Sequence, residues 1–481
     1  MATEKKNGLK SMKRRHFLTA AAGVAGAAAI GNAGGAAENG KAASRVEGCD
    51  YDVVVIGGGF AGTTAARDSR ENGYKTLLVE ARNRLGGRTF TADFEGHSIE
   101  MGGTWIHWTQ PSVWAEVQRY GLEIIETPGF VPDVNIAYLD GETRILTEDE
   151  MAGVAGGFKA FMEGSRTTWE RPYDVRHTWD RVVEADRISA AEKLASLKLP
   201  RLQHVLIEGV IASMAHNMAD QMSYAEALRW MSCPGFNDFE IFFDAIGRYK
   251  FKDGTISLIN AMVEDARPEI SLSTVVSRVE DLGDCVRVDT ADGRRITAGA
   301  VIVTLPMNVV GSVDFTPQLH PKVIEAGRKR HTGQGVKVYA RTAAPVGNVM
   351  MYGGPADLIA NAWTYKEAED HTILVCFGNE PDKLDIHDER AVEAALARFL
   401  PDIKISSVLG YDWNLDPYAR GTYCSYKPGW MAEYYDHFQK DTGRIVFGSG
   451  DHGEGWRGFI DGAIREGGKA AQRVHRLLEA A

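Results

Sequence analysis

The sequence predicts an α/β protein, because a strand, a helix and a second strand follow one another at the start of its folded part. Residues 51–56 form a short apolar run rich in β-branched side chains, as in a parallel strand buried on both faces. Residues 63–71 suit a helix, and residues 75–79 are a second apolar run that ends on the acid Glu80. A βαβ unit of the Rossmann type has this order of elements.

Three glycines join the first strand to the helix. Gly57, Gly59 and Gly62 fill the glycine positions of a G-x-G-x-x-G pattern. The first allows a tight turn, the second lets the backbone approach a pyrophosphate, and the third lets the helix pack closely on the strand. Free N–H groups at the helix N-terminus would bind the phosphates, and Glu80 would accept hydrogen bonds from a ribose. We therefore predict a dinucleotide-binding unit.

The composition is that of a globular protein with more than one domain. The chain has 481 residues, of which 44% are hydrophobic and 25% charged, and this length predicts about two to three domains. The net charge of −11 argues against a nucleic-acid partner, which would require a basic face. The five cysteines have neither metal-binding nor redox spacing, and their odd number argues against a disulfide framework.

The first 45 residues resemble an export signal. The twin arginines Arg14 and Arg15 precede Phe17 and Leu18, and a weakly apolar run rich in alanine and glycine follows at residues 20–37. This is the twin-arginine pattern of bacterial export. The run is too short and too rich in glycine for a membrane span, and no other stretch approaches the ~18 apolar residues that a span requires. We expect a signal at residues 1–45, a periplasmic protein and no membrane span.

A second glycine pair narrows the choice of dinucleotide. Residues 81–88 follow Glu80 directly and end in Gly86, Gly87 and Arg88. This stretch resembles the E-x-x-x-x-x-G-G-R segment of FAD-containing amine oxidases, where it suits a loop that passes over the pyrophosphate. NAD dehydrogenases with the same first unit normally lack it. The resemblance therefore implies FAD.

The resemblance to the flavin monoamine oxidase family extends over nearly all of the chain after the expected signal. Further stretches that carry it are residues 100–107, 251–255, 273–277, 300–306 and 443–463. Within the family, residues 102–111 and 113–116 are most similar to bacterial amine oxidases of nicotine degradation.

The resemblance implies an amine-oxidase-like, two-domain architecture. A discontinuous, Rossmann-type FAD-binding domain comprises residues 46–130, 251–317 and 420–481. An α+β substrate-binding domain comprises residues 131–250 and 318–419. In the substrate domain we expect residues 148–242 to be mostly helical and residues 338–408 to be mostly strands.

The resemblance also implies which residues bind the cofactor. They lie in the glycine turn, in the ribose strand, in two loops beside the flavin and in the last segments of the chain. The expected FAD contacts are Gly57, Gly59, Phe60, Ala61, Gly62, Glu80, Ala81, Arg82, Gly87, Arg88, Gly102, Gly103, Thr104, Trp105, Val276, Ser449, Gly450, Asp451, Phe459 and Ile460.

Three side chains are expected to act at the flavin. Lys337, in a short alternating strand, aligns with the family lysine that holds a water against flavin N5, and burial there would lower its pKa. Tyr423 and Phe459 align with two aromatic residues that steer the amine toward the flavin face and exclude water. Trp108 and Trp363 are further candidates for substrate contact. Core packing, rather than the pocket, is expected for residues such as Trp230.

Some positions depart from the family pattern. The usual F-A-G-x-E ending of the last flavin strand is F-G-S-G-D here, so Ser449 and Asp451 replace a glycine and a glutamate. Cys424 follows Tyr423, whereas the cysteine that carries covalent flavin in some relatives precedes that aromatic residue. Neighbours on a strand face opposite sides. We therefore expect Cys424 to point away from the amine path and the FAD to be noncovalent.

The resemblance implies an FAD-dependent amine oxidase that acts on a C–N bond of a nicotine-type pyridine alkaloid: pseudooxynicotine, nicotine or 6-hydroxynicotine. Hydride would pass to flavin N5, the imine would hydrolyse, and oxygen or a cytochrome-type acceptor would take the electrons. An L-amino-acid or polyamine oxidase and a flavin-binding protein without turnover are the alternatives. No metal site or nucleophilic triad is expected. The oligomeric state is open, with a homodimer as one option.

Overall fold

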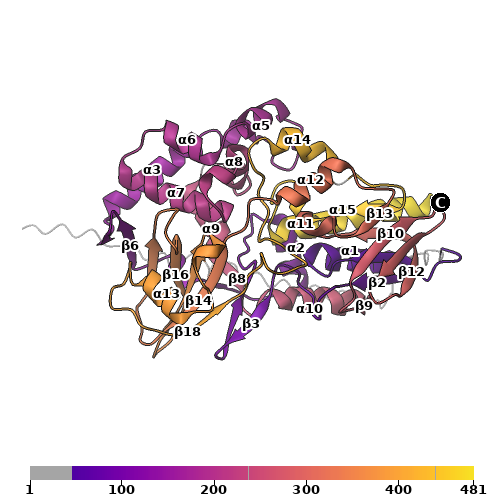
Figure 1. The fold of residues 1–481 in the computed structure, drawn as a ribbon, viewed down its shortest axis with the longest axis horizontal. Helices are drawn as coiled ribbons and strands as arrows, with labels where there is room; N and C mark the ends of the chain where they lie inside the picture. The colour runs from indigo at the N-terminus through magenta and orange to yellow at the C-terminus, as the bar shows by residue number, and fades with distance from the viewer. Residues whose placement is uncertain (1–45, 237, 439, 481) are drawn as a thin grey trace, which may run out of the picture. The chain divides into compact units, whose positions relative to one another are not determined.

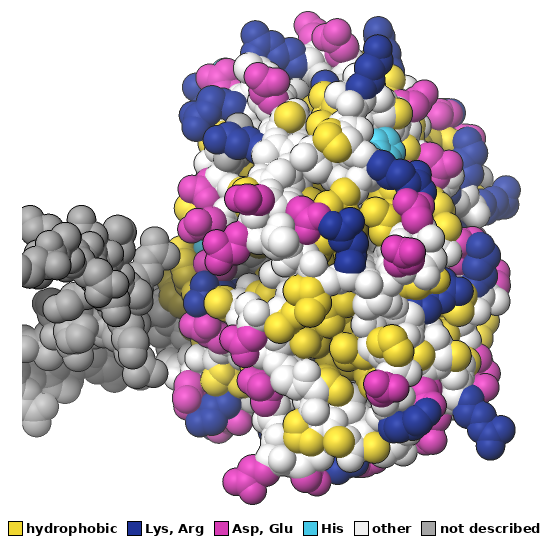
Figure 2. Space-filling model, turned by 90° about the vertical axis from the view of Figure 1, so that its left-hand side faces the viewer, with side chains coloured by type: hydrophobic (Ala, Val, Ile, Leu, Met, Phe, Trp, Pro, Cys, Tyr) yellow, Lys and Arg dark blue, Asp and Glu magenta, His cyan; other side chains and the backbone are white. Residues whose placement is uncertain are grey.

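The computed structural model describes residues 46–236, 238–438 and 440–480. The expected export signal at residues 1–45 lies outside the described residues. No helix within the described ranges has the length and apolarity needed to cross a bilayer. On the face that Figure 2 shows, acidic and basic side chains are interspersed among apolar patches, without a continuous basic surface.

The first sheet contains the predicted Rossmann-type unit. In spatial order its strands are β13 (Asp314–Thr316), β10 (Val276–Asp281), β11 (Val286–Thr290), β12 (Arg295–Val303), β1 (Tyr51–Ile56), β2 (Thr76–Val79) and β9 (Glu269–Ser271), and β19 (Ile445–Phe447) also pairs with β12. β1 lies parallel to both β12 and β2, whereas β11 is antiparallel to its two neighbours. Val53, Val54 and Val55 are fully buried, which confirms the expected strand.

Three helices pack beside the parallel strands of this sheet. They are α1 (Phe60–Glu71), α10 (Thr255–Ala266) and α15 (Ile460–Glu479). α1 packs against both other helices, and α15 also contacts β12 and β19 (Figure 1). The approach of α15 to α1 is close, since a Cβ on Gly467 would lie 2.1 Å from the carbonyl oxygen of Ala61. The last helix of the chain therefore completes the unit that the first strand begins.

The second sheet comes from the middle of the chain. In spatial order its strands are β18 (Ile405–Gly410), β14 (Val336–Thr342), β17 (Thr372–Gly378), β16 (Asn361–Glu367), β15 (Val349–Tyr352), β6 (Val134–Leu139) and β7 (Glu142–Ile145). Its neighbours are antiparallel except for β15 and β6. The expected strand around Lys337 is thus β14.

A helical segment packs on the second sheet, as expected for residues 148–242. Its helices are α3 (Glu148–Phe161), α4 (Ser165–Thr168), α5 (Trp179–Asp186), α6 (Ala190–Ser196), α7 (Arg201–Ala215), α8 (Tyr224–Ser232) and α9 (Phe239–Gly247). One buried apolar cluster joins this segment to the sheet and includes Phe158, Ile207, Leu228, Tyr339 and Trp363. The segment therefore shares its core with the strands that it covers.

Shorter elements connect these layers. The hairpin β3 (Thr91–Phe94) and β4 (His97–Glu100) and the pair β5 (Ile124–Glu126) and β8 (Tyr249–Phe251) lie outside the two sheets. The other helices are α2 (Pro111–Tyr120), α11 (Met307–Val310), α12 (Pro321–Lys329), α13 (Glu389–Leu396) and α14 (Trp430–Tyr434). Short 3-10 turns are η1 (Pro128–Phe130), η2 (Ala219–Gln221), η3 (Pro381–Lys383), η4 (Tyr435–His437) and η5 (Gly450–His452).

The order of the strands agrees with the expectation, drawn from the family resemblance, that the FAD-binding domain is discontinuous. Every strand of the first sheet falls within residues 46–130, 251–317 or 420–481, and every strand of the second sheet falls within residues 131–250 or 318–419. The α/β class is confirmed. The domain boundaries themselves stay a prediction.

Candidate active site

One cavity of about 590 Å³ extends from the glycine turn of the first sheet to the second sheet. We call its two ends the nucleotide half and the substrate half. Expected residues that line the nucleotide half are Gly57, Gly59, Phe60, Ala61, Glu80, Ala81, Arg82, Gly87, Arg88, Gly102, Gly103, Thr104, Trp105, Val276, Ser449, Gly450 and Ile460. The substrate half is lined by Phe130, Val210, Ser213, Met214, His216, Trp230, Phe243, Ile246, Met350, Tyr352, Asn361, Trp363, Phe377, Tyr423 and Phe459.

The glycine turn has the geometry that a phosphate cradle requires. Gly57 has a φ of +107°, in the region that favours glycine. A Cβ on Gly62 would lie 1.7 Å from the carbonyl oxygen of Gly57, so that position tolerates no side chain. Gly59 is the N-cap of α1 and no side chain caps the helix. The first N–H groups of α1 are therefore free to bind an anion.

Glu80 already holds this turn in place. Its Oε2 accepts a hydrogen bond from the Gly58 N–H at 2.7 Å, and its Oε1 accepts one from the Arg82 N–H at 2.8 Å. A carboxylate can accept about four hydrogen bonds. The expected contact with a ribose is therefore compatible with the two that Glu80 makes to the backbone.

The second glycine loop lies against the first. Gly86 pairs with Gly59, and the Gly86 N–H donates to the carbonyl oxygen of Gly58 at 2.8 Å. Gly86 and Gly87 have φ values of +104° and +60°. A Cβ on Gly87 would lie 3.0 Å from the Cα of Gly59. Both loops thus present bare backbone to the cavity, which suits a pyrophosphate between a glycine turn and a helix N-terminus.

Arg88 and Asp451 form an ion pair at the edge of the cavity. Asp451 is fully buried and does not line the cavity, so it acts on this region through Arg88 rather than by direct contact. Its Oδ2 also accepts the Met307 N–H at 2.8 Å. Burial alone would raise the pKa of Asp451, but Arg88, His331 and His452 together outweigh it and lower the pKa. The shortened acid therefore still holds the arginine, as an anion.

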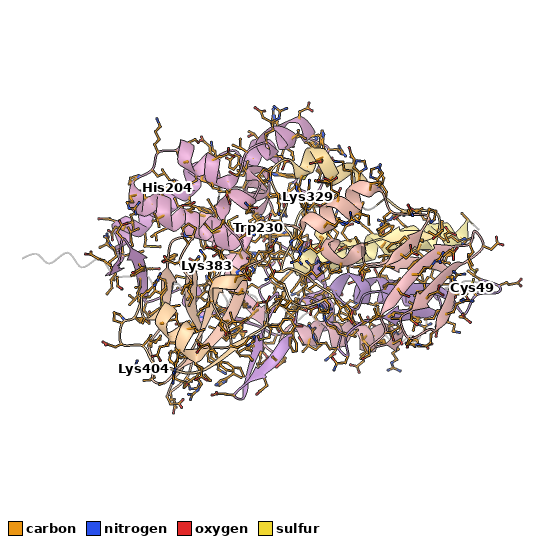
Figure 3. All side chains as sticks on the ribbon, in the orientation of Figure 1. Cys49, His204, Trp230, Lys329, Lys383 and Lys404 are labelled. Atoms are coloured by element: carbon orange, nitrogen blue, oxygen red, sulfur yellow. The ribbon has the colours of Figure 1, made fainter. Side chains whose placement is uncertain are left out.

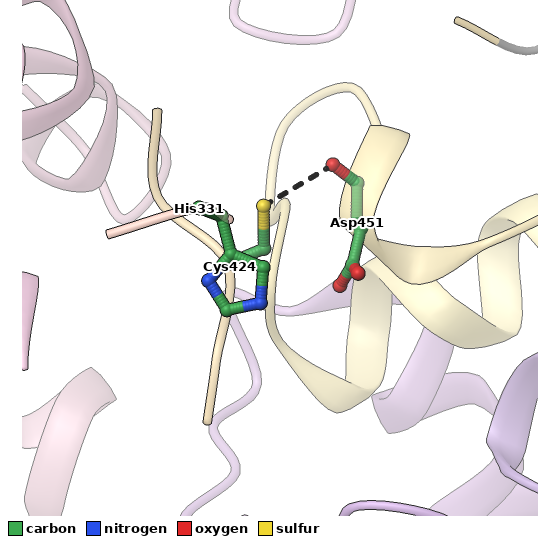
Figure 4. Close-up of side chains that lie close together, drawn as sticks. All are labelled: His331, Cys424 and Asp451. Atoms are coloured by element: carbon green, nitrogen blue, oxygen red, sulfur yellow. Dashed lines mark hydrogen bonds between the residues drawn. The ribbon is translucent and has the colours of Figure 1, made fainter. Parts of the chain in front are cut away.

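His331, Cys424 and Asp451 bring a nitrogen, a sulfur and a carboxylate oxygen within 4.8 Å of one another (Figure 4). The Cys424 thiol donates to the backbone carbonyl of Asp451 at 3.5 Å. Burial raises the pKa of this thiol well above its ordinary value, and both carboxylate oxygens of Asp451 already have partners. A neutral thiol beside an engaged carboxylate is a poor ligand set for a cation.

Lys337 is buried on β14 at the border between the two halves. Its Nζ donates to the carbonyl oxygens of Glu100 at 2.7 Å and Gly102 at 3.1 Å, and to the Thr104 hydroxyl at 2.7 Å. Three acceptors match the three N–H bonds of an ammonium group. Burial nevertheless lowers the pKa of Lys337 to about 7, so both protonation states are accessible near neutral pH. The hydrogen bonds fix Nζ beside the loop that lines the nucleotide half.

Tyr423 is fixed on two sides. Its hydroxyl donates to the carbonyl oxygen of Ser213, and its ring stacks on His216 with centroids 5.0 Å apart. The His216 Nε2 lies 3.2 Å from the carbonyl oxygen of Val336, which can only accept, so Nε2 carries the proton. Burial lowers the pKa of His216 to about 4, which keeps the ring neutral. A rigid, uncharged aromatic face results.

The other aromatic residue of the expected pair, Phe459, lies at the start of α15. It is the N-cap of this helix, no side chain caps it, and Ile460 follows it into the cavity lining. Trp230 packs on the Phe459 ring edge to face at 4.6 Å and also contacts Tyr423 at 6.1 Å. The free N–H groups and partial positive charge of a helix end therefore meet the cavity beside an aromatic wall.

The structure places three residues of this region differently from what was expected. Tyr423 does not lie on a strand, because the segment around it is irregular. Cys424 nevertheless stays outside the cavity lining, as expected. Trp108 is 49% exposed and lies outside the lining, whereas Trp363 belongs to it. Gly62 supports the turn from outside the lining. Trp230, labelled in Figure 3, packs in the core as expected and also lines the cavity.

Three further lining residues were not predicted from the sequence. His216 and Phe377 lie in segments without a motif, and their place depends on contacts between the sheet and α7. Asn361 carried a weak signal, since it is a polar residue at the start of an apolar strand. Their positions follow from tertiary packing rather than from local sequence.

Comparisons with known proteins agree with this geometry. The model of the family "Flavin containing amine oxidoreductase" matches residues 60–475. The chain is 40% identical to pseudooxynicotine dehydrogenase of Pseudomonas sp, over 97% of this chain and 96% of that protein. It is 35% identical to nicotine dehydrogenase of Pseudomonas putida, over 98% of each.

Solved structures show the same fold. Wild-type putrescine oxidase bound to putrescine superposes with a TM-score of 0.76 at 21% identity, over 88% of this chain and 98% of that chain. Cyclohexylamine oxidase of Brevibacterium oxydans also gives 0.76, at 20% identity, over 89% and 100%. Fold, site and relatives agree, and a flavin cofactor follows from them: the chain belongs to the family of flavin-containing amine oxidoreductases and is an enzyme that acts on CH–NH donors.

Proposed function

We propose that this enzyme oxidises a C–N bond of a nicotine-type pyridine alkaloid amine, with pseudooxynicotine, nicotine and 6-hydroxynicotine as candidate substrates. The observation that carries this proposal is the lining of the substrate half, which is aromatic and aliphatic apart from a few neutral polar groups. Such a lining suits a flat, uncharged ring joined to one amine. The names of two relatives above 30% identity, pseudooxynicotine dehydrogenase and nicotine dehydrogenase, support the same substrate class.

Charge in the cavity argues against the two rival substrates. A polyamine would need acids along its path, but the one carboxylate in the described cavity lining is Glu80, in the nucleotide half. An amino acid would need a free cation for its carboxylate. Arg82 and Arg88 are paired with Asp416 and Asp451, and Lys337 is bound by three acceptors. A neutral, single-amine substrate fits this distribution.

A flavin-binding protein without turnover is also disfavoured. Such a protein has no need of a buried lysine with an accessible proton, nor of two aromatic side chains that line one cavity with it. Lys337, Tyr423 and Phe459 all line the cavity of this chain.

The residues present fit FAD, which when bound would supply the acceptor for a hydride from the α-carbon of the amine. The helix N-termini of α1 and α15, the two glycine loops and Arg88 would hold it. Tyr423 and Phe459 would position the deprotonated amine and exclude water. Lys337 would hold or release a proton at Nζ during the return of the electrons to oxygen or to a cytochrome-type acceptor.

We further propose that the FAD is noncovalent. In the described part of the chain no cysteine lines the cavity, and the Cys424 thiol is buried against the backbone of Asp451. His216 does line the cavity, but both of its ring nitrogens are engaged. Among the described residues, neither a cysteine thiol nor an unengaged histidine nitrogen is therefore placed to attach the cofactor.

The substrate class is tested by anaerobic mixing of the purified, FAD-loaded enzyme with each amine. Pseudooxynicotine, nicotine, 6-hydroxynicotine, L-leucine and spermidine form the panel, and flavin absorbance is the readout. We expect rapid bleaching with at least one of the alkaloids and none with the last two. Bleaching by L-leucine or spermidine alone would assign the rival activity, and a flavin that no amine reduces would leave a binding protein.

The attachment of FAD is tested by acid precipitation. We expect the yellow colour of both the wild type and a Cys424→Ala variant to pass into the supernatant, because no covalent bond holds it. Flavin that stays with the wild-type pellet but leaves that of the variant would contradict the proposal and assign the bond to Cys424.

The Lys337→Met variant tests the lysine. We expect reoxidation of the reduced flavin to slow by roughly 100-fold, a typical loss for a group that handles a proton, while the KM for the amine changes little. The pKa of Lys337 is lowered to about 7, so its ammonium form predominates below pH 7 and disappears above it. Since a cation stabilises the charge that develops on oxygen, the wild-type rate should fall as the pH rises through 7.

Lys250 provides the matched control, because it is also buried and lies outside the cavity lining. The Lys250→Met variant should keep the transition near pH 7, and Lys337→Met should abolish it. Normal oxygen reactivity in Lys337→Met would refute the role proposed for this lysine.

A further inference from the structure

Asn361 lies at the start of β16, on the face of the strand that also carries Trp363, and both side chains line the substrate half. Its Nδ2 donates to the carbonyl oxygen of Gly209 at 3.1 Å and to the Ser213 hydroxyl at 2.7 Å. Both partners belong to α7. A carbonyl oxygen can only accept a hydrogen bond, so the nitrogen of the amide must face Gly209. The orientation of this amide is therefore fixed by the helix.

The Oδ1 atom of Asn361 faces the other way. No described group donates a hydrogen bond to it, although the residue is only 5% exposed. This oxygen is not sealed in protein. It is open to the cavity that Asn361 lines. A ligand with an N–H or O–H group would satisfy it.

The polar groups of Tyr423, Tyr352 and His216 in the substrate half are already engaged, whereas the indole N–H donors of Trp230 and Trp363 are buried without a partner among the described residues. The Tyr423 hydroxyl donates to the Ser213 carbonyl oxygen, and the Tyr352 hydroxyl donates to Asn135 Oδ1 at 3.4 Å. Both ring nitrogens of His216 have partners, with Nδ1 at 2.9 Å from the Thr422 hydroxyl and Nε2 on a backbone carbonyl. Asn361 Oδ1 thus stands out as a fixed acceptor that lacks a donor.

Ser213 connects this acceptor to the amine path. Its hydroxyl accepts the Asn361 amide, and its carbonyl oxygen accepts the hydroxyl of Tyr423. The two side chains are therefore held by the same residue of α7. This shared partner ties Asn361 to the aromatic residue that is expected to steer the amine.

We propose that Asn361 Oδ1 accepts a hydrogen bond from the N–H of the substrate amine, and so selects secondary amines over tertiary ones. This inference rests on the proposed function and narrows it. A neutral acceptor suits the deprotonated amine that oxidation requires, because a carboxylate in its place would stabilise the ammonium form. Among the candidate substrates, this hydrogen bond favours the open-chain secondary amine pseudooxynicotine over nicotine. The amine nitrogen of nicotine, in its saturated ring, carries a methyl group and no hydrogen.

The test compares pseudooxynicotine with its N-methylated, tertiary counterpart in the FAD-loaded enzyme. The wild type should show a higher kcat/KM for the secondary amine. In the Asn361→Leu variant, which keeps the approximate size of the side chain, kcat/KM for the secondary amine should fall by about 10- to 100-fold, as expected for the loss of one hydrogen bond at a buried site. Its value for the tertiary amine should change much less, so the preference collapses.

Asn379→Leu is the matched control, because Asn379 is buried and has an unpartnered Oδ1 but lies outside the cavity lining. It should keep the wild-type preference. A second variant, Ser213→Ala, removes one of the two groups that hold the Asn361 amide and should weaken the preference by a smaller factor. The Ser213→Ala variant also tests the role of Asn361 if the Asn361→Leu variant fails to bind FAD.

The outcomes separate the two proposals. If neither amine reduces the wild-type flavin but another compound does, the substrate class is wrong, and the same comparison is made with the secondary and tertiary forms of that compound. If the wild type oxidises pseudooxynicotine but the variants at Asn361 and Ser213 lose both amines in parallel, or lose neither, the role of Asn361 is overturned while the proposed function stands.

Discussion

Arg88 and Asp451, 363 residues apart in the chain, form an ion pair with a fully buried carboxylate that joins the second glycine loop to the last segment of the first sheet. The free oxygen of Asp451 takes the N–H of Met307, and Arg88 also donates to the carbonyl oxygen of Thr422 at 2.8 Å. Four distant segments therefore meet at one carboxylate and one guanidinium. Removing Arg88 would leave the buried carboxylate of Asp451 without its cation, at a cost of about 3–5 kcal/mol. Because Thr422 precedes Tyr423, the same pair helps to position the aromatic wall of the amine path.

This constraint divides the cavity into two chemical environments. In the nucleotide half, bare glycine backbone and two uncapped helix N-termini provide N–H groups for an anionic cofactor, and the cations are already paired. In the substrate half, rings and aliphatic side chains surround a few neutral polar groups whose orientation α7 fixes through Gly209 and Ser213. Lys337 lies at the border with a pKa near neutrality. Charged side chains of the described lining thus lie on the side where a cofactor would bind and at its border, and the amine meets a largely apolar, uncharged surface.

The sequence predicted the glycine turn at residues 57–62 well, because the requirement for glycine there is local: a positive φ and a Cβ clash follow from the turn itself. The substrate half was harder. Tyr423 was placed at the cavity on a strand that does not form, Trp108 proved half exposed, and Trp230 packs in the core as expected but also lines the cavity. Which of two tryptophans meets a cavity depends on how helices and sheet pack, and sequence periodicity does not record that. Asn361 was missed for the same reason, since its amide is oriented by α7.

A double-mutant cycle on Arg88 and Asp451 tests most directly the claim that one ion pair assembles the cofactor site. The FAD-free proteins carrying Arg88→Met, Asp451→Asn or both changes would be titrated with FAD, and the dissociation constants compared with that of the wild type. Each single change should weaken FAD binding about tenfold or more, and the double change should cost little beyond either single one, because the two residues act as a unit. Wild-type affinity in both single variants, or losses that simply add, would contradict this account.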